Sequence, residues 1–219
     1  MPPELIIFDC DGVLIDSEGI ASALIAREMT ALGWMMDADE AQRQFIGMCI
    51  TDMEPVIEAK IGYSLPLGWR AHIEGEMLDA LGSQVRPMPG AKPMLEKITR
   101  LGIDWRIASN SSDQEMAVKF ASSGLAHLTA GRAHSAVSLA ARGGRPKPAP
   151  DIYLDAASAS GIAPKHCLVL EDSALGVTAA VRAGMACYGF APHGDGAALL
   201  TAGATALLSD LDEIFGVLA

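Results

Sequence analysis

The chain has 219 residues, half of them hydrophobic, with a formal net charge of -11 and an isoelectric point near 4.8. This length suits one large domain, or a core with a smaller insert, and the apolar content is ample for a buried core. Nucleic acids and anionic membranes both favour partners with surface Lys and Arg. We therefore expect neither of them as a partner of this acidic protein.

The four cysteines are widely spaced, and no CxxC pair or Cys/His cluster occurs among them: Cys10, Cys49, Cys167 and Cys187. This pattern predicts neither a zinc site nor a disulfide framework, and reduced thiols are typical of a cytoplasmic protein. The first apolar run is too short for a signal peptide, and no run is long enough to cross a bilayer. We expect a cytoplasmic protein. The oligomeric state is open, with a monomer favoured.

The first notable pattern is the apolar run 5–7 followed by Phe8-Asp9-Cys10-Asp11-Gly12, which predicts a strand that enters a tight turn. Residues two apart share a face of an extended chain, so Asp9 and Asp11 are expected to point into one site. Two neighbouring carboxylates repel each other unless a cation or a shared proton intervenes, and Mg²⁺ prefers oxygen ligands. One carboxylate could then attack phosphorus while the other transfers protons.

Two other interpretations of this segment are weaker. Asp and Gly are turn formers, so the segment could be an ordinary junction between a strand and a turn. An EF-hand requires an oxygen ligand where Val13 stands, and an apolar strand rather than a helix precedes the loop.

Apolar residues at spacings of three and four then predict helices, without a convincing strand, over about residues 17–84. The predicted helices are one over about 21–32 ended by Gly33, one opened by a Thr51–Glu54 capping box and ended by Gly62, and one from Pro66 to Gly82.

Strands and helices alternate after residue 85. The predicted elements are helices over 91–101, 112–123, beyond Pro150 and over 174–183, and strands over 103–108, 132–135 (weak), 167–170 and 185–190. This alternation predicts an α/β fold with a doubly wound parallel sheet. The all-helical segment interrupts it just after the first strand. We therefore expect a catalytic core of residues 1–16 and 85–219, and an inserted helical cap of residues 17–84.

Polar groups follow each predicted core strand, where open α/β sheets bind their ligands. They are Ser109-Asn110, the Pro-flanked Lys147, and Glu171-Asp172-Ser173. Lys147 and the Ser109 hydroxyl can hold a phosphate, while Asp9, Glu171 and Asp172 can hold Mg²⁺. Taken singly, these groups could equally be helix caps, acidic residues at a helix N-terminus and a solvated lysine.

In this order, the motifs Asp9-Cys10-Asp11-Gly12-Val13, Ser109-Asn110, Lys147-Pro148 and Glu171-Asp172-Ser173 resemble those of the haloacid dehalogenase-like hydrolases. The resemblance is closest to the branch of phosphoglycolate phosphatases and β-phosphoglucomutases. It spans nearly the whole chain, and it implies a Rossmann-like core with an α-helical cap.

The resemblance also implies a role for each residue. Asp9 is the nucleophile that becomes an aspartyl phosphate, and Asp11 protonates the leaving oxygen and then activates water. Ser109, Asn110 and Lys147 bind the substrate phosphate. Asp9, the Asp11 backbone carbonyl, Glu171 and Asp172 bind Mg²⁺. The expected activity is hydrolysis of a small phosphomonoester, a sugar or sugar-acid phosphate, by a phosphatase whose partner is a small phosphorylated metabolite.

Two alternatives to the phosphatase remain. True dehalogenases generally lack the second Asp of the first motif, whereas the mutases are closer. The mutases carry a His where Ala21 stands here and a cap Arg that a loose alignment on Gly47 places at Ile50, although the nearby Arg43 could substitute. The other alternative is a phosphorylatable signalling domain or a phosphate-ligand sensor. We expect the loop at residues 45–48 to face the site and to help select the substrate.

Overall fold

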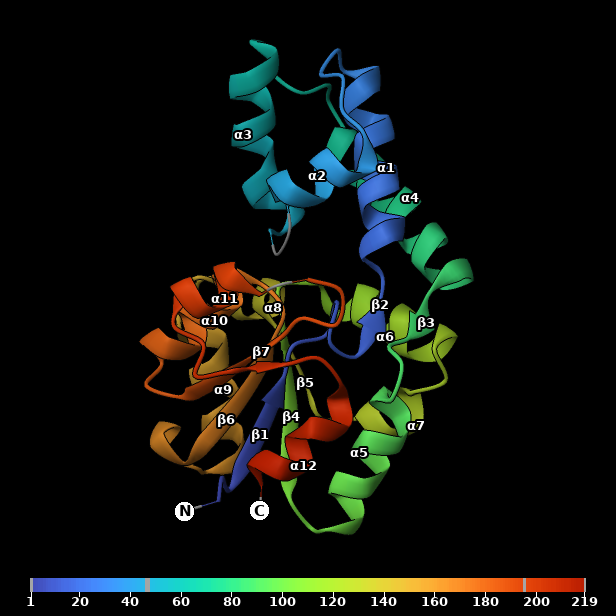
Figure 1. The fold of residues 1–219 in the computed structure, drawn as a ribbon. Helices are drawn as coiled ribbons and strands as arrows, with labels where there is room; N and C mark the ends of the chain where they lie inside the picture. Colours follow the sequence, from blue (N-terminus) through green and yellow to red (C-terminus); the bar gives the residue numbers. More distant parts are fainter. Residues whose placement is uncertain (1, 46–47, 195, 219) are drawn as a thin grey trace.

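The computed structural model describes residues 2–45, 48–194 and 196–218. A six-stranded parallel sheet forms its centre, in the order β5-β4-β1-β6-β7-β8 (Figure 1). The strands are β1 (Leu5–Phe8), β4 (Asp104–Ser109), β5 (Ala133–Ser135), β6 (Cys167–Glu171), β7 (Ala186–Phe190) and β8 (Leu207–Leu208). The predicted doubly wound parallel α/β fold is confirmed. Its β1 strand lies in the middle, between β4 and β6.

Helices cover both faces of this sheet. They are α5 (Ala91–Arg100), α6 (Asp113–Ser122), α7 (Ala126–Thr129), α8 (Ala136–Ala140), α9 (Asp151–Ser160), α10 (Ala174–Arg182), α11 (Ala197–Ala202) and α12 (Ile214–Val217), with 3₁₀ turns at Pro164–His166 and Leu211–Glu213. Ile6 and Phe8 pack on the face of α5 and α12, whereas Leu5 and Ile7 pack on the face of α9 and α10. Every residue of β1 is apolar because successive side chains point to opposite faces of the sheet and helices cover both faces.

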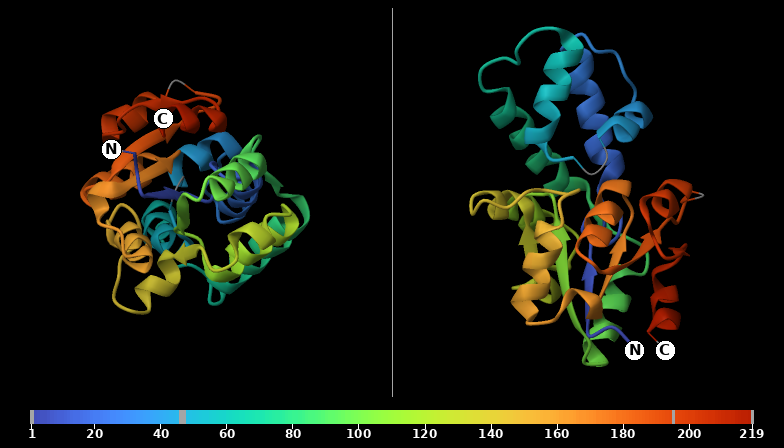
Figure 2. Two further views of the ribbon diagram at one scale, coloured as in Figure 1. Left: turned by 90° about the horizontal axis from the view of Figure 1, so that it is seen from below. Right: turned by 90° about the vertical axis from the view of Figure 1, so that its left-hand side faces the viewer.

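Four helices lie beyond the carboxyl ends of the strands (Figures 1 and 2). They are α1 (Glu18–Ala31), α2 (Ala38–Phe45), α3 (Ile50–Ile61) and α4 (Trp69–Gln84). The short antiparallel strands β2 (Ile15–Asp16) and β3 (Arg86–Pro87) pair where this helical segment leaves and rejoins the sheet-bearing part. The two connections between the helical segment and the sheet therefore run side by side as this short strand pair, which we did not predict from the sequence.

Some predicted helix boundaries are wrong. The N-cap of α3 is Cys49, and Thr51 lies inside the helix, so the Thr51–Glu54 capping box does not form. Helix α4 begins after Gly68 and continues through Gly82, because Leu81 is buried and α4 packs against α6 there. Tertiary packing outweighs the weak helix propensity of a single glycine.

Other boundaries were predicted correctly. Helix α3 ends at Gly62, whose φ of 81° is the left-handed conformation that suits a C-terminal glycine.

None of the helices in the described part of the chain has the length and apolarity needed to cross a membrane.

Candidate active site

The candidate nucleophile Asp9 stands at the carboxyl end of β1. Its backbone N–H still donates to Leu170 O at 3.0 Å, so the sheet ladder holds Asp9 one residue beyond the strand. The Lys147 Nζ lies 2.5 Å from Asp9 Oδ1, and Asp9 is only 8% exposed. Burial, the sheet ladder and one ammonium thus hold the Asp9 carboxylate in a fixed position, as a nucleophile would require.

Asp11 stands on the turn that follows. Gly12 adopts a φ of 73°, a conformation that side chains disfavour, and its N–H donates to Ile15 O at 2.8 Å. Asp11 accepts hydrogen bonds from the hydroxyls of Ser17 and Ser111, and the Lys119 Nζ lies 2.7 Å from its Oδ1. Asp11 therefore has its own cation, separate from the one that pairs with Asp9.

Lys147 joins two strand ends through a single ammonium. Its Nζ donates to Asp9 Oδ1, to Glu171 Oε1 at 2.6 Å and to Ala108 O at 2.9 Å. Its backbone N–H donates to Asn110 Oδ1 at 3.0 Å. Burial lowers the pKa of Lys147, but Asp9 and Glu171 more than offset this, so the pKa is raised and the ammonium stays charged.

Glu171 is fully buried at the end of β6, and hydrogen bonds hold both of its oxygens. The Tyr153 hydroxyl donates to Oε1 at 2.8 Å, and the N–H and hydroxyl of Ser173 each donate to Oε2 at 2.9 Å. These partners, together with Lys147, fix the orientation of the Glu171 carboxylate.

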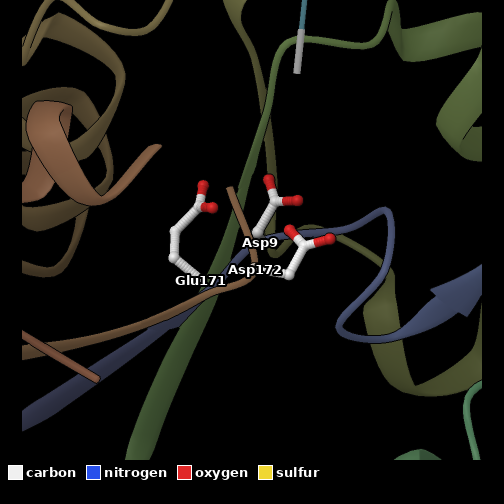
Figure 3. A group of neighbouring side chains, drawn as sticks. All are labelled: Asp9, Glu171 and Asp172. Atoms are coloured by element: carbon white, nitrogen blue, oxygen red, sulfur yellow. The ribbon is translucent and has the colours of Figure 1, made fainter. Parts of the chain in front are cut away.

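The carboxyl groups of Asp9, Glu171 and Asp172 face a common space (Figure 3). One oxygen of each lies within 4.8 Å of the others. Three oxygen donors this close fit a hard divalent cation such as Mg²⁺. The predicted ligand side chains are thus brought together by the ends of β1 and β6.

The two aspartates of the first motif have pKa values shifted in opposite directions. Burial raises the pKa of Asp9 to about 7, with Glu171 adding to the rise and Lys147 opposing it. The pKa of Asp11 is lowered, because the charge of Lys119 and the hydrogen bonds from Lys119, Ser17 and Ser111 outweigh the opposing effect of burial. Without a metal, Asp9 is therefore the more easily protonated of the two, the reverse of the order expected with Mg²⁺ on Asp9.

Ser109 and Asn110 end β4 beside this cluster. The Ser109 Oγ accepts from the Ser111 N–H at 3.1 Å. The helix cap of α6 is instead Ser112, which forms a capping box with Glu115. Ser112 therefore caps α6, and Ser109 is not the helix cap.

A cavity of about 390 Å³ lies above these side chains. The predicted residues Asp9, Asp11, Ser109, Asn110, Lys147 and Asp172 all line it, whereas Glu171 lies beneath it. The helical segment forms the opposite wall, through residues that include Phe45, Met48 and Ile50. Phe45 and Met48 thus face the site as expected, while Ile46 and Gly47 of the same loop lie outside the described residues.

Three residues of the site were not predicted. Lys119, Ser111 and Tyr153 contact Asp11 or Glu171 directly. Lys119 shares the buried face of α6 with Met116 and Phe120. The sequence signal for Lys119 was its position among apolar residues at i, i+3 and i+4 of a predicted helix. A lysine on such a buried face needs an anionic partner.

Gly176, in α10, lies against the Glu171 carboxylate. A Cβ on this glycine would stand 1.7 Å from Glu171 Oε1, so Gly176→Ala must displace the carboxylate or the helix. We expect a loss of roughly 1–3 kcal/mol in the free energy of unfolding, together with lower kcat. Denaturant unfolding and a phosphate-release assay measure both effects. Gly75→Ala is the matched control, because that helical glycine faces open space; equal behaviour of the two variants would refute the packing argument.

Comparisons with known proteins agree with this geometry. A family model described as haloacid dehalogenase-like hydrolase matches residues 3–184. The 6-phosphogluconate phosphatase of Escherichia coli is 25% identical over 87% of this chain and 84% of its own length. A phosphorylated carbohydrates phosphatase of Thermotoga maritima is 28% identical over 98% of both chains.

Among solved structures, a conserved haloacid dehalogenase-like protein of unknown function from Agrobacterium tumefaciens superposes with a TM-score of 0.82. It is 32% identical, and the match covers 98% of this chain and 96% of that one. Fold, family match and phosphatase relatives together define a hydrolase that acts on phosphoric monoesters, as predicted. The chain belongs to the haloacid dehalogenase-like hydrolases.

Proposed function

We propose that this enzyme is a Mg²⁺-dependent phosphatase that hydrolyses a small phosphomonoester of the sugar-phosphate type through an aspartyl phosphate on Asp9. The observation that carries the proposal is the position of Asp9 at the floor of the cavity, with Lys147 on one side and the carboxylates of Glu171 and Asp172 close by. Phosphoryl transfer depends mainly on positioning and charge neutralisation, and this arrangement provides both. The names of the phosphatase relatives support the substrate class.

In the first step, an Asp9 oxygen bonds to phosphorus, the ester P–O bond breaks, and Asp11 gives a proton to the leaving oxygen. Because Lys119 lowers the pKa of Asp11, this step requires Asp11 to take up that proton as the substrate binds. In the second step, Asp11 takes a proton from water, whose oxygen attacks phosphorus, so that phosphate leaves and Asp9 is regenerated. Lys147, Ser109 and Asn110 hold the phosphoryl oxygens. Mg²⁺ would neutralise charge on the phosphoryl group. The residues that would hold it are Asp9, Asp172, Glu171 and the backbone carbonyl of Asp11.

Hydrolysis is favoured over mutase chemistry by the wall of the cavity. Ala21 and Ile50, where the resembling mutases carry His and Arg, both line it. Arg43, the possible substitute, is exposed and is not among the described lining residues. The wall at these positions thus offers no second proton carrier and no second phosphate clamp.

We also propose that residues 17–84 act as a cap domain over a core of residues 1–16 and 85–219. Support comes from the β2–β3 pair at the junction, and from the cavity walls, which the two parts share. A cap that closes excludes water while Asp9 is phosphorylated and admits it afterwards. The cytoplasmic location and the monomeric state stay predictions.

A panel of phosphorylated metabolites, assayed for phosphate release with and without Mg²⁺, tests this function. We expect release that depends on Mg²⁺. Isomerisation stimulated by a bisphosphate, without free phosphate, would instead identify a mutase. Tight binding with negligible turnover would identify a sensor.

The affinity for Mg²⁺ is expected to depend on pH. A metal requires the ionised carboxylate, and burial raises the metal-free pKa of Asp9 to about 7. Below that pH, the proton competes with Mg²⁺, so the apparent affinity should fall roughly tenfold per pH unit. Titrations of activity with Mg²⁺ at several pH values measure this. An affinity that is flat between pH 7 and pH 5 would argue against Asp9 as a ligand.

A further inference from the structure

The cavity has two ends of different character. Its floor, at the strand ends, carries serines, carboxylates and the two lysines Lys119 and Lys147. Its opposite wall comes from the helical segment and is mainly apolar. Its large apolar side chains include Ile25, Phe45, Met48, Ile50, Met53 and Met77. A phosphoryl group on the floor would therefore direct the rest of the ester toward an apolar surface.

The described residues at the apolar end of the cavity include no cation. Of the described residues of the helical segment that line the cavity, Glu74 is the single charged one, and it is acidic. Lys119 is ion-paired with Asp11, and Lys147 with Asp9 and Glu171. A second anionic group on the substrate would thus lose its water without gaining a positive partner, which is costly.

We infer that the leaving group of the substrate is uncharged and presents an apolar face to the helical segment. This inference rests on the proposed phosphatase function and narrows it. Sugar acids and bisphosphates become poor substrates, because their second anion would face Glu74 and apolar side chains. Substrates with deoxy, alkyl or ring-carbon surface become good ones, because Phe45 and the methionines can cover that surface. Methionine is flexible and suits irregular apolar groups.

Two matched pairs of primary phosphate esters test the inference. Cyclohexylmethyl phosphate and glucose 6-phosphate share a six-membered ring and differ in ring oxygen and hydroxyls. Glucitol 6-phosphate and 6-phosphogluconate differ in one carboxylate. We expect kcat/KM to be at least about tenfold higher for the uncharged member of the second pair, because an unpaired carboxylate is costly to bury. The apolar member of the first pair should be favoured by a smaller margin, because Gln42 and Thr51 in the wall leave sugar hydroxyls some polar neighbours.

A variant separates charge from other causes. Ile50→Arg places a cation in the apolar wall and should raise kcat/KM for 6-phosphogluconate relative to glucitol 6-phosphate by at least about tenfold. Leu67→Arg adds the same charge on the exposed outside of the helical segment, away from the cavity, and should leave the ratio unchanged. An unchanged unfolding transition of Ile50→Arg shows that the variant folds.

The outcomes keep the two proposals apart. Efficient turnover with a preference for glucose 6-phosphate and 6-phosphogluconate overturns the inference and leaves the phosphatase function intact. Failure to release phosphate from any of the four esters and from an aryl phosphate, with Mg²⁺ present, contradicts the phosphatase function and the inference with it.

Discussion

Asp9→Asn is expected to lower kcat by roughly 10⁴-fold or more, because the amide cannot form the phosphoenzyme and removal of a nucleophile has effects of this size. The substitution preserves shape, and burial already disfavours the charge on Asp9 by raising its pKa to about 7. The fold should therefore tolerate the neutral side chain. Phosphate release under saturating substrate and Mg²⁺ measures the effect, and denaturant unfolding checks the fold.

Asp16→Asn is the matched control for this experiment. Asp16 lies in β2, close in sequence to the site, but it is exposed and does not line the cavity. Its activity should equal that of the unmodified protein. If Asp9→Asn retained substantial turnover, Asp9 would not be the nucleophile, and attack by water activated by Asp11 would be the better account.

The sequence predicted the positions of those site residues that lie at the end of a strand. Asp9, Ser109 and Glu171 stand at or directly after β1, β4 and β6, and parallel strands end at the same edge of a sheet. The order of motifs and the apolar strands were therefore sufficient to gather them. Lys147 is on a loop, and its place depended on the resemblance of its motif.

The partners of Asp11 could not be predicted in the same way. Lys119 lies 108 residues away on α6, and its contact with Asp11 depends on how α6 packs on the sheet. The order of the two aspartate pKa values likewise depends on which ammonium pairs with which carboxylate. Such pairing is a property of tertiary packing, so local sequence patterns do not contain it.

Helix boundaries show the same limit. Gly33 and Gly62 follow the ends of α1 and α3 with φ values of 89° and 81°, whereas Gly82 lies within α4 where that helix contacts α6. A Cβ on Gly82 would stand 3.3 Å from Val118, so this glycine allows close approach of the two helices. The same residue type has two functions, and only the neighbouring helix distinguishes them.

Lys147→Met is expected to impair both stability and activity, because one ammonium holds two buried carboxylates. The methionine fills similar space but leaves Asp9 and Glu171 without their cation, and breaking a buried ion pair costs roughly 3–5 kcal/mol. The phosphoryl oxygens lose a positive partner, so kcat should fall by roughly 10³-fold. Lys165→Met, at an exposed lysine, is the control and should change neither quantity.

The stability of Lys147→Met should also depend on pH in a defined direction. Removal of the cation that opposes burial raises the pKa of Asp9 further above its ordinary value of 3.8. The folded variant then binds protons more tightly than the unfolded chain, so its free energy of unfolding should rise as the pH falls from about 7 toward 4. Denaturant unfolding across this range measures it. A loss of stability that does not lessen on acidification would mean that packing, rather than unpaired buried charge, is what Lys147 contributes to the fold.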